Sequence, residues 1–197
     1  VNTGELSEQR ILDDNGFADG DFKLYSDGIN VYVAFTQLNR RLRSNDAENI
    51  SGYLGSLEVK AAVLESDGNF AVSNYLSSNI YYDMKPVIGT YNGKISAFWI
   101  QNNDNDMTGI SVNGNSIYKS DYSHGSWCAP VLIKDGINTI TDFEAANGKI
   151  AYITDSNNDL MTISNSDGTK DGYSDKKLTV INLETLETVE SSDNAYF

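Results

Sequence analysis

A tight turn, a dense apolar run, and a group of amides and acids follow one another three times along the chain. Aligning the starts of the three runs also aligns three asparagines, with spacings of 64 and 55 residues in both sets: Val31, Ile95 and Ile150, with Asn39, Asn103 and Asn158. A repeat of this length with strand-like content indicates a propeller or an array of β-modules.

Each repeat is predicted to hold four short strands. We expect them at residues 22–25, 31–37, 57–64 and 69–76; then at 84–90, 95–101, 115–120 and 127–133; then at 140–145, 149–154, 178–183 and 186–191. Asp-Gly and Asn-Gly between the first two strands of each unit tolerate the positive φ of tight hairpins. Units of four short strands joined by such turns are typical of propeller blades.

The hydrophobic pattern changes from the inner to the outer strands of a unit. The second strands are nearly all apolar, as in residues 95–100, which predicts burial on both faces. The third strand at 57–64 alternates better, as stacked blades require of outer strands. No window has a helical period, although residues 45–54 have room for one short helical turn.

We therefore predict an all-β fold of the β-propeller type, with three complete four-stranded antiparallel blades in one segment, 1–197. Blades are expected at 20–80, 81–138 and 139–193; residues 1–19 would hold the last strand of a preceding blade, at 4–12, and 194–197 would open the next. Propellers close with about four to eight blades, so three predict part of a larger propeller. Open blade edges would favour self-association.

Charge and composition narrow the classes of function. The net charge of −14 argues against nucleic acid, which needs clustered Lys and Arg. The one basic cluster, at 40–43, is either a solvated loop or a contact for an acidic glycan. No apolar run approaches the roughly 18 residues of a membrane span. An acidic chain rich in Tyr, Asn, Ser and Thr suggests a bacterial secreted or cell-surface protein, so we expect an extracellular location.

No catalytic constellation is visible, and we predict that the chain is not an enzyme. Cys128 follows Trp127 and is expected to be a buried, inert thiol. His124 has no second histidine with which to build a zinc site or a triad. Acids such as Asp142 and Glu144 form a glycosidase pair only if the fold brings carboxylates within roughly 5–10 Å.

Residues 119–127, Lys-Ser-Asp-Tyr-Ser-His-Gly-Ser-Trp, carry a resemblance to a known family. They resemble the Asp-box, the Ser-x-Asp-x-Gly-x-Thr-Trp hairpin of sialidase-like propellers, although Gly125 stands one residue too close to Trp127. The resemblance implies four-stranded propeller blades over about residues 22–191, with the Asp-box as a structural turn. The arginine triad and the Tyr–Glu pair of that family have no match, because Arg stands only at 10, 40, 41 and 43.

Candidate ligand contacts lie in the loops after the second strands, which share one rim in a propeller. The candidate ligand-binding residues are Gln37, Asn39, Gln101, Asn102, Asn103, Asp155, Asn157 and Asn158. Amides offer paired donors and acceptors that suit sugar hydroxyls. The alternative is that these amides and acids only form turns and keep the surface soluble.

The same loops suggest a cation. Asp oxygens suit Ca²⁺, which takes six to eight oxygen ligands. The candidate ligands are Asp104, Asp106, Asp155 and Asp159. Residues 165–171 resemble part of an EF-hand loop, but flanking helices and a closing Glu are absent from the pattern, which favours a surface loop. No other cofactor is expected.

The leading hypothesis is a non-catalytic extracellular or cell-surface module that binds a glycan or a surface protein through the loop rim. One alternative is a fragment of a sialidase-like glycoside hydrolase whose catalytic residues lie partly outside this chain. The other is a structural spacer in a larger surface protein.

Overall fold

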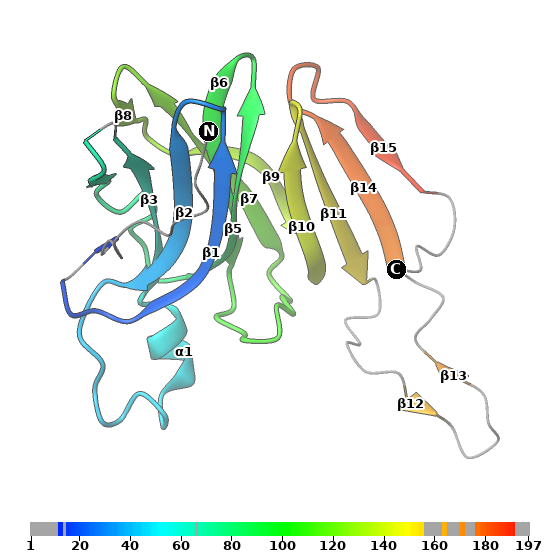
Figure 1. Cartoon of the computed structure of the whole chain (residues 1–197). Coiled ribbons are helices and arrows are strands. Elements are labelled where there is room, and N and C mark those ends of the chain that lie inside the picture. Colours follow the sequence, from blue (N-terminus) through cyan, green and yellow to red (C-terminus); the bar gives the residue numbers. More distant parts are fainter. Residues whose placement is uncertain are drawn as a thin grey trace.

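Three antiparallel β-sheets stand side by side in the computed structural model, which describes residues 12–13, 15–65, 67–155, 163–164, 170–171 and 176–191 (Figure 1). The described residues include one short helix, α1 (Ile50–Leu54), inside the region where a helical turn was expected. The all-β prediction is therefore confirmed.

The first sheet is a four-stranded meander in chain order. Its strands are β1 (Asp19–Ser26), β2 (Val31–Leu38), β3 (Leu57–Leu64) and β4 (Phe70–Val72). β4 is shorter than the expected 69–76, because serine hydroxyls take over part of the ladder. Ser73 Oγ accepts from the Ala61 amide at 2.9 Å, and Ser77 Oγ accepts from the Val59 amide at 2.8 Å.

The second sheet has five strands, since its predicted fourth strand is split in two. The strands are β5 (Tyr82–Tyr91), β6 (Lys94–Asn102), β7 (Asn115–Ser123), β8 (Ser126–Trp127) and β9 (Val131–Ile137), and β8 and β9 both pair with β7. Pro130 lies in the break and has no N–H to donate to a ladder. Cys128 lies in the same break and is exposed, so the prediction of a buried thiol is wrong.

The third sheet repeats the meander with a hairpin inserted after its second strand. Its strands are β10 (Ile140–Ala146), β11 (Lys149–Asp155), β14 (Lys176–Asn182) and β15 (Thr188–Glu190), and the inserted hairpin is β12 (Ile163–Ser164) and β13 (Lys170–Asp171). In the second and third sheets, Asn-Gly turns join the first two strands. Asn92 and Gly93 have φ of 49° and 70°, and Asn147 and Gly148 have 48° and 72°, as predicted for tight hairpins.

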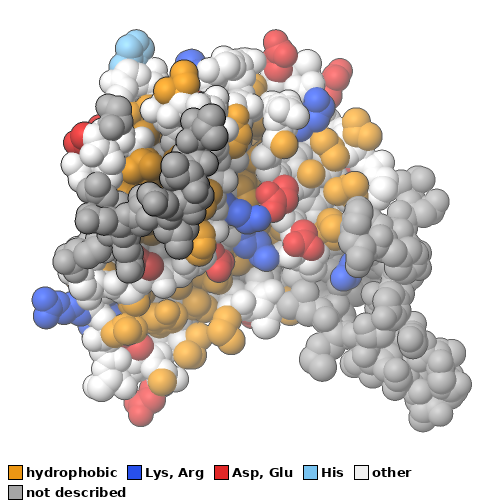
Figure 2. Space-filling model, viewed as in Figure 1, with side chains coloured by type: hydrophobic (Ala, Val, Ile, Leu, Met, Phe, Trp, Pro, Cys, Tyr) orange, Lys and Arg blue, Asp and Glu red, His pale blue; other side chains and the backbone are white. Residues whose placement is uncertain are grey.

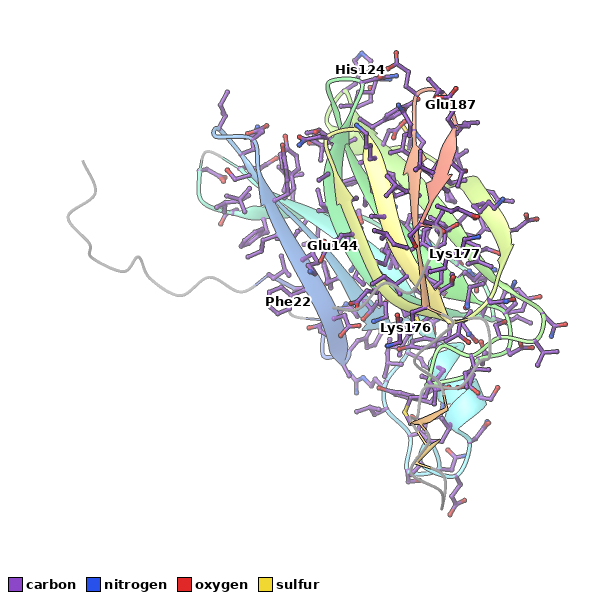
Figure 3. The ribbon with its side chains drawn as sticks, turned by 90° about the vertical axis from the view of Figure 1, so that its right-hand side faces the viewer. Phe22, His124, Glu144, Lys176, Lys177 and Glu187 are labelled. Carbon is purple, nitrogen blue, oxygen red and sulfur yellow. The ribbon has the colours of Figure 1, made fainter. Side chains whose placement is uncertain are left out.

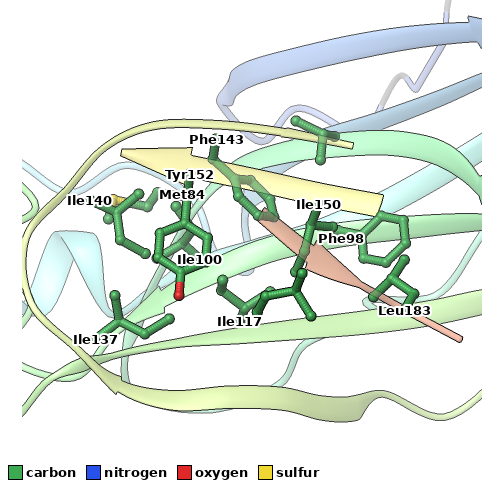
Figure 4. Close-up of a cluster of buried hydrophobic side chains, with 12 residues drawn as sticks. Met84, Phe98, Ile100, Ile117, Ile137, Ile140, Phe143, Ile150, Tyr152 and Leu183 are labelled. Atoms are coloured by element: carbon green, nitrogen blue, oxygen red, sulfur yellow. The ribbon is translucent and has the colours of Figure 1, made fainter. Parts of the chain in front are cut away.

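The hydrophobic core lies at the two interfaces between neighbouring sheets, which we call joints. Strand β6 contributes to both of them. Ala97 and Trp99 belong to the cluster shared with the first sheet, whereas Phe98 and Ile100 belong to the cluster shared with the third (Figure 4). Successive side chains of a strand point to opposite faces. The unbroken apolar run of β6 therefore reflects burial on both faces, as the sequence predicts.

The ring closure, the blade count and the boundaries 20–80, 81–138 and 139–193 stay predictions. Apart from Leu12, the expected strand at 4–12 lies outside the described residues, as do residues 194–197. Within the described part of the chain, no helix has the length and hydrophobicity that a membrane crossing needs.

Candidate functional site

A hollow of about 470 Å³ lies where the first strands of the three sheets, β1, β5 and β10, come together. We call it the central hollow. Its lining includes five charged side chains and two phenylalanines, of which Phe22 is exposed and Phe143 is buried; the charged residues are Asp21, Lys23, Lys85, Asp142 and Glu144. Figure 2 shows basic and acidic side chains gathered in the middle of this face, between β1 and β10. The hollow is thus lined by residues far apart in the sequence.

Each first strand has an irregular register beside the hollow. The shifts fall between Asp19 and Phe22 in β1, between Met84 and Val87 in β5, and between Ile140 and Asp142 in β10. A β-bulge takes a residue out of the ladder and redirects side chains, and bulges are frequent next to active sites. All three irregularities lie near the start of their strands, next to residues that line the hollow.

The bulge in β5 places a strained lysine in the lining. Lys85 has φ of 49°, in the left-handed region that non-glycine residues rarely adopt. Such a conformation costs on the order of 1–3 kcal/mol and is concentrated at ligand sites. Pro86 follows it and lacks an N–H, which a bulge tolerates and a regular ladder does not.

Two glycines allow close approaches on first strands: Gly20 of β1 faces β2, and Gly89 of β5 faces β10. A Cβ on Gly20 would lie 2.5 Å from Thr36 Oγ1. A Cβ on Gly89 would lie 3.0 Å from the Ala145 carbonyl oxygen, so β5 approaches β10 with no side chain between them at this point.

One ion pair crosses the central hollow. Lys23 Nζ donates to Glu144 Oε1 at 2.5 Å and so joins β1 to β10. The two side chains are 51% and 65% exposed, which leaves both within reach of a ligand. Figure 3 labels Glu144 and Phe22, which both line the hollow, and the Phe22 ring is exposed.

The β2–β3 and β6–β7 loops, which carry rim candidates, leave their sheets at the lower end in Figure 1. The β2–β3 and β6–β7 loops also make contact, since Asn105 Nδ2 donates to the Ile80 carbonyl, against which Gly55 packs. The amide side chains themselves are mostly engaged inside the protein. Gln37 is fully buried, and its Nε2 donates to Asp19 Oδ1 at 2.7 Å.

The other amides of the first two loops likewise have internal partners. Asn39 Nδ2 donates to Glu58 Oε1, and Gln101 Nε2 donates to Asn103 Oδ1. Asn102 is buried; its Nδ2 donates to the Ile110 carbonyl at 3.0 Å, and its Oδ1 accepts from the amides of residues 104 and 106. The bonds of Asn102 therefore order the β6–β7 loop. A ligand-binding role for the candidate amides stays a prediction.

The predicted calcium ligands of the second sheet are also hydrogen-bonded within their loop. Asp104 Oδ2 accepts from the Asn113 amide at 3.0 Å and from Ser111 Oγ at 2.8 Å, and the Asn113 amide is the main cause of its lowered pKa. Asp106 Oδ1 accepts from the Thr108 amide at 2.7 Å. Among the described residues, no group of three or more His, Cys, Asp or Glu side chains is placed to hold a metal ion.

The loop after β11 carries the remaining candidate residues. The side chain of Asp155 and the residues Asn157, Asn158 and Asp159 lie outside what the structure describes. The calcium site therefore stays a prediction.

Two other motifs are resolved. Residues 119–127 do form a hairpin, with φ of 52° at His124 and 80° at Gly125, while its relation to the Asp-box stays a prediction. Arg40 binds Asp46 with both terminal nitrogens and holds the pKa of that carboxyl at about 2. Arg40 is thus paired inside its own loop.

Sequence reasoning missed most of the central hollow. Asp142 and Glu144 were candidates, but Asp21, Lys23 and Lys85 were not. The one local signal was Lys-Pro at 85–86 within an apolar strand, because a proline there indicates a bulge.

Comparison with known proteins yields fold neighbours only. No protein-family model and no curated protein sequence matches the chain. A Trypanosoma rangeli sialidase in complex with 2,3-difluorosialic acid superposes with a TM-score of 0.52 at 13% identity, over 91% of this chain and 31% of the sialidase. Another structure of Trypanosoma rangeli sialidase gives a TM-score of 0.50 at 13% identity, over 98% and 33% of the two chains.

A puromycin-hydrolysing peptidase of Mycobacterium tuberculosis also matches, with a TM-score of 0.43 at 14% identity, over 90% of this chain and 31% of the peptidase. This score is too low for any further comparison. The chain spans about one third of the length of these proteins. The two sialidase superpositions confirm, for the fold, the distant sialidase-like resemblance that the sequence indicates.

Proposed function

We propose that the chain is part of a β-propeller that binds a carbohydrate in the central hollow. The observation that supports this proposal is the convergence of three bulged first strands on one cluster of charged side chains and an exposed ring. Its volume of about 470 Å³ is within the roughly 300–1,000 Å³ of small-molecule sites.

The lining has the chemistry that a hydroxyl-rich ligand needs. The carboxylates of Asp21, Asp142 and Glu144 accept hydrogen bonds from hydroxyls, and the ammonium groups of Lys23 and Lys85 donate to ring and hydroxyl oxygens. The Phe22 ring offers an apolar face beside them. The sialidase with bound difluorosialic acid makes a sugar the first ligand class to test.

In this proposal Asn39 and Asn103 stay candidate contacts on the rim loops, in addition to the central hollow. The module acts without catalysis, outside the cell or on its surface. A surface protein that presents a glycan is then the natural macromolecular partner.

The second candidate is a segment of a glycoside hydrolase, which the placement of Asp142 and Glu144 favours. They are two residues apart on β10, so their side chains share a face, with Cα atoms about 7 Å apart. Catalytic carboxyl groups of glycosidases lie roughly 5–9.5 Å apart, a separation that the side chains of two neighbouring positions on one strand face can adopt. The remaining catalytic groups would come from chain outside these 197 residues.

A glycan array followed by calorimetric titration tests the proposal. We expect one glycan class to bind, and Asp142→Asn with Glu144→Gln to weaken its binding at least tenfold. Glu184→Gln with Glu187→Gln is the matched control: it removes two exposed acids from the turn before β15, and Figure 3 shows Glu187 well away from Glu144. Unchanged affinity in the hollow variant would refute the site. Hydrolysis of a reporter glycoside that Asp142→Asn abolishes would instead support the second candidate.

A further inference from the structure

Two buried carboxyl groups meet where the first and second sheets join. Glu58 is the second residue of β3 and is 1% exposed, and Asp83 is the second residue of β5 and is fully buried. Asn79 links the two carboxyl groups, because its backbone amide donates to Glu58 and its side-chain Nδ2 donates to Asp83. Neither one belongs to the central hollow.

Neutral donors surround this pair. Glu58 Oε2 accepts from Ser77 Oγ at 2.7 Å, and its Oε1 accepts from the Asn79 amide at 3.0 Å and from Asn39 Nδ2 at 3.3 Å. Asp83 Oδ2 accepts from Asn79 Nδ2 at 3.1 Å, whereas its Oδ1 is buried without a donor. Among the described residues, no ion pair includes either carboxyl group.

The nearby charged groups do not neutralise the pair. Lys60 Nζ binds Asp13 Oδ2 at 2.6 Å and lies over the ring of Tyr75. Burial raises the pKa of Tyr75, and the charges of Asp13, Glu58 and Asp19 raise it further, so the phenol stays neutral. Among the described residues, Lys60 is therefore committed to Asp13 and does not offset the charge of the pair.

Two ionised carboxylates cannot be buried together at low cost without a cation, because both lose hydration and they repel each other. The hydrogen bonds indicate where the proton resides. Glu58 accepts three donors, and the orphaned Oδ1 of Asp83 becomes satisfied once it carries a proton that it donates to Glu58. Burial first, and the charge of Glu58 second, raise the pKa of Asp83 well above 3.8.

We propose that Asp83 and Glu58 share one proton and that this pair acts as a pH-sensitive latch between the first and second sheets. The latch also fixes Asn39 after β2 and Asn79 in the β4–β5 connection. Asp83 stands two residues before Lys85, so opening of the latch would also disturb the bulge of the central hollow.

The direction of the pH effect follows from the raised pKa. A group whose pKa is raised in the folded state stabilises the fold fully below its unfolded pKa, here near 3.8. That contribution is lost as the pH rises through the folded pKa, when Asp83 ionises beside Glu58. The joint between the first and second sheets therefore weakens on the alkaline side.

Thermal unfolding of the whole chain between about pH 5 and about pH 9 tests the latch, with wild type, Asp83→Asn and the control Glu187→Gln. We expect the Tm of wild type and of the control to fall relative to Asp83→Asn as the pH rises, with a gap that grows by about 3 °C or more. Parallel profiles of wild type and Asp83→Asn would overturn the proposal.

A second measurement covers the case in which Asp83→Asn does not fold. Infrared spectroscopy of the wild type should show a protonated carboxyl band that persists at about pH 6, above the range in which ordinary carboxyl groups titrate. Glu58→Gln and Asp83→Asn should each remove or shift that band. Its absence from wild type at about pH 6 would also overturn the proposal.

Discussion

The two joints between the sheets contain different kinds of side chain, although β5 and β6 contribute to both. The joint between the second and third sheets is apolar, with Met84, Phe98 and Ile150 in its core. The joint between the first and second sheets holds Trp99 but also the carboxyl pair of Glu58 and Asp83. The apolar joint needs no particular protonation state, whereas the mixed joint does.

Adjacent residues of β5 illustrate this difference. The side chain of Asp83 turns to the first sheet and meets Glu58, while that of Met84 turns to the third sheet and meets the apolar cluster. The alternation of a strand thus places an ionisable group in one joint and a hydrophobic group in the other. Burial raises the pKa of Tyr152 in the apolar joint above 10, so at lower pH values stability should depend on pH through the mixed joint only.

The largest expected effect is that of Phe98→Ala in the apolar joint. The ring is fully buried, so its removal leaves a cavity and should lower the free energy of unfolding by about 3–5 kcal/mol. Chemical denaturation at two pH values should give the same loss at both. Phe22→Ala is the matched control, since Phe22 is 65% exposed and should cost little. A loss that changes with pH would contradict the comparison.

The next effect is Asp83→Asn compared with Met84→Ala. Met84→Ala should destabilise by about 2–5 kcal/mol at every pH, because it empties part of the apolar joint. The difference in the free energy of unfolding between Asp83→Asn and wild type should change sign as the pH rises. The variant should be the less stable protein at low pH and the more stable one at high pH, since it removes the ionisation of a group with a raised pKa. Denaturant midpoints of the two variants across pH distinguish the joints, and similar pH slopes would show that the distinction is wrong.

A smaller effect is expected from Lys85→Gly in the central hollow. Glycine adopts a φ of 49° without strain, so the variant should gain on the order of 1 kcal/mol of stability while it weakens ligand binding. Lys85→Ala keeps the strain and loses the amine, and therefore serves as the control. Calorimetric titration and thermal unfolding measure the two effects, and a Lys85→Gly variant less stable than Lys85→Ala would contradict the assigned strain.

The smallest effect is that of the Lys23–Glu144 ion pair. Both side chains are more than half exposed, so a double-mutant cycle with Lys23→Ala and Glu144→Gln should give a coupling of about 0–1 kcal/mol that salt reduces. A coupling unaffected by salt would indicate that the pair is shielded from solvent.

Local chemistry was enough to predict most of the strands. Residues 57–64 were expected as a strand from their alternation and form β3 with those bounds. The turns at Asn92 and Asn147 follow from backbone preferences of Asn-Gly. The unbroken apolar run at 95–100 predicted burial on both faces, because a strand with no polar side has no face to turn to water.

The candidate site depended on contacts that no local pattern carries. Lys23, Lys85 and Glu144 meet because three sheets pack with their first strands together, and register shifts decide which side chains enter the hollow. Gln37 was expected at the surface, yet tertiary partners hold its amide inside.

The sequence by itself determined the strands, the hairpin turns and the all-β class, since these follow from interactions between residues close together in the chain. Only the tertiary structure decided that Glu58 and Asp83 share a buried joint and that three charged strands enclose one hollow. The physical reason is that burial and charge proximity arise from packing between distant segments, and these two properties determine protonation and binding.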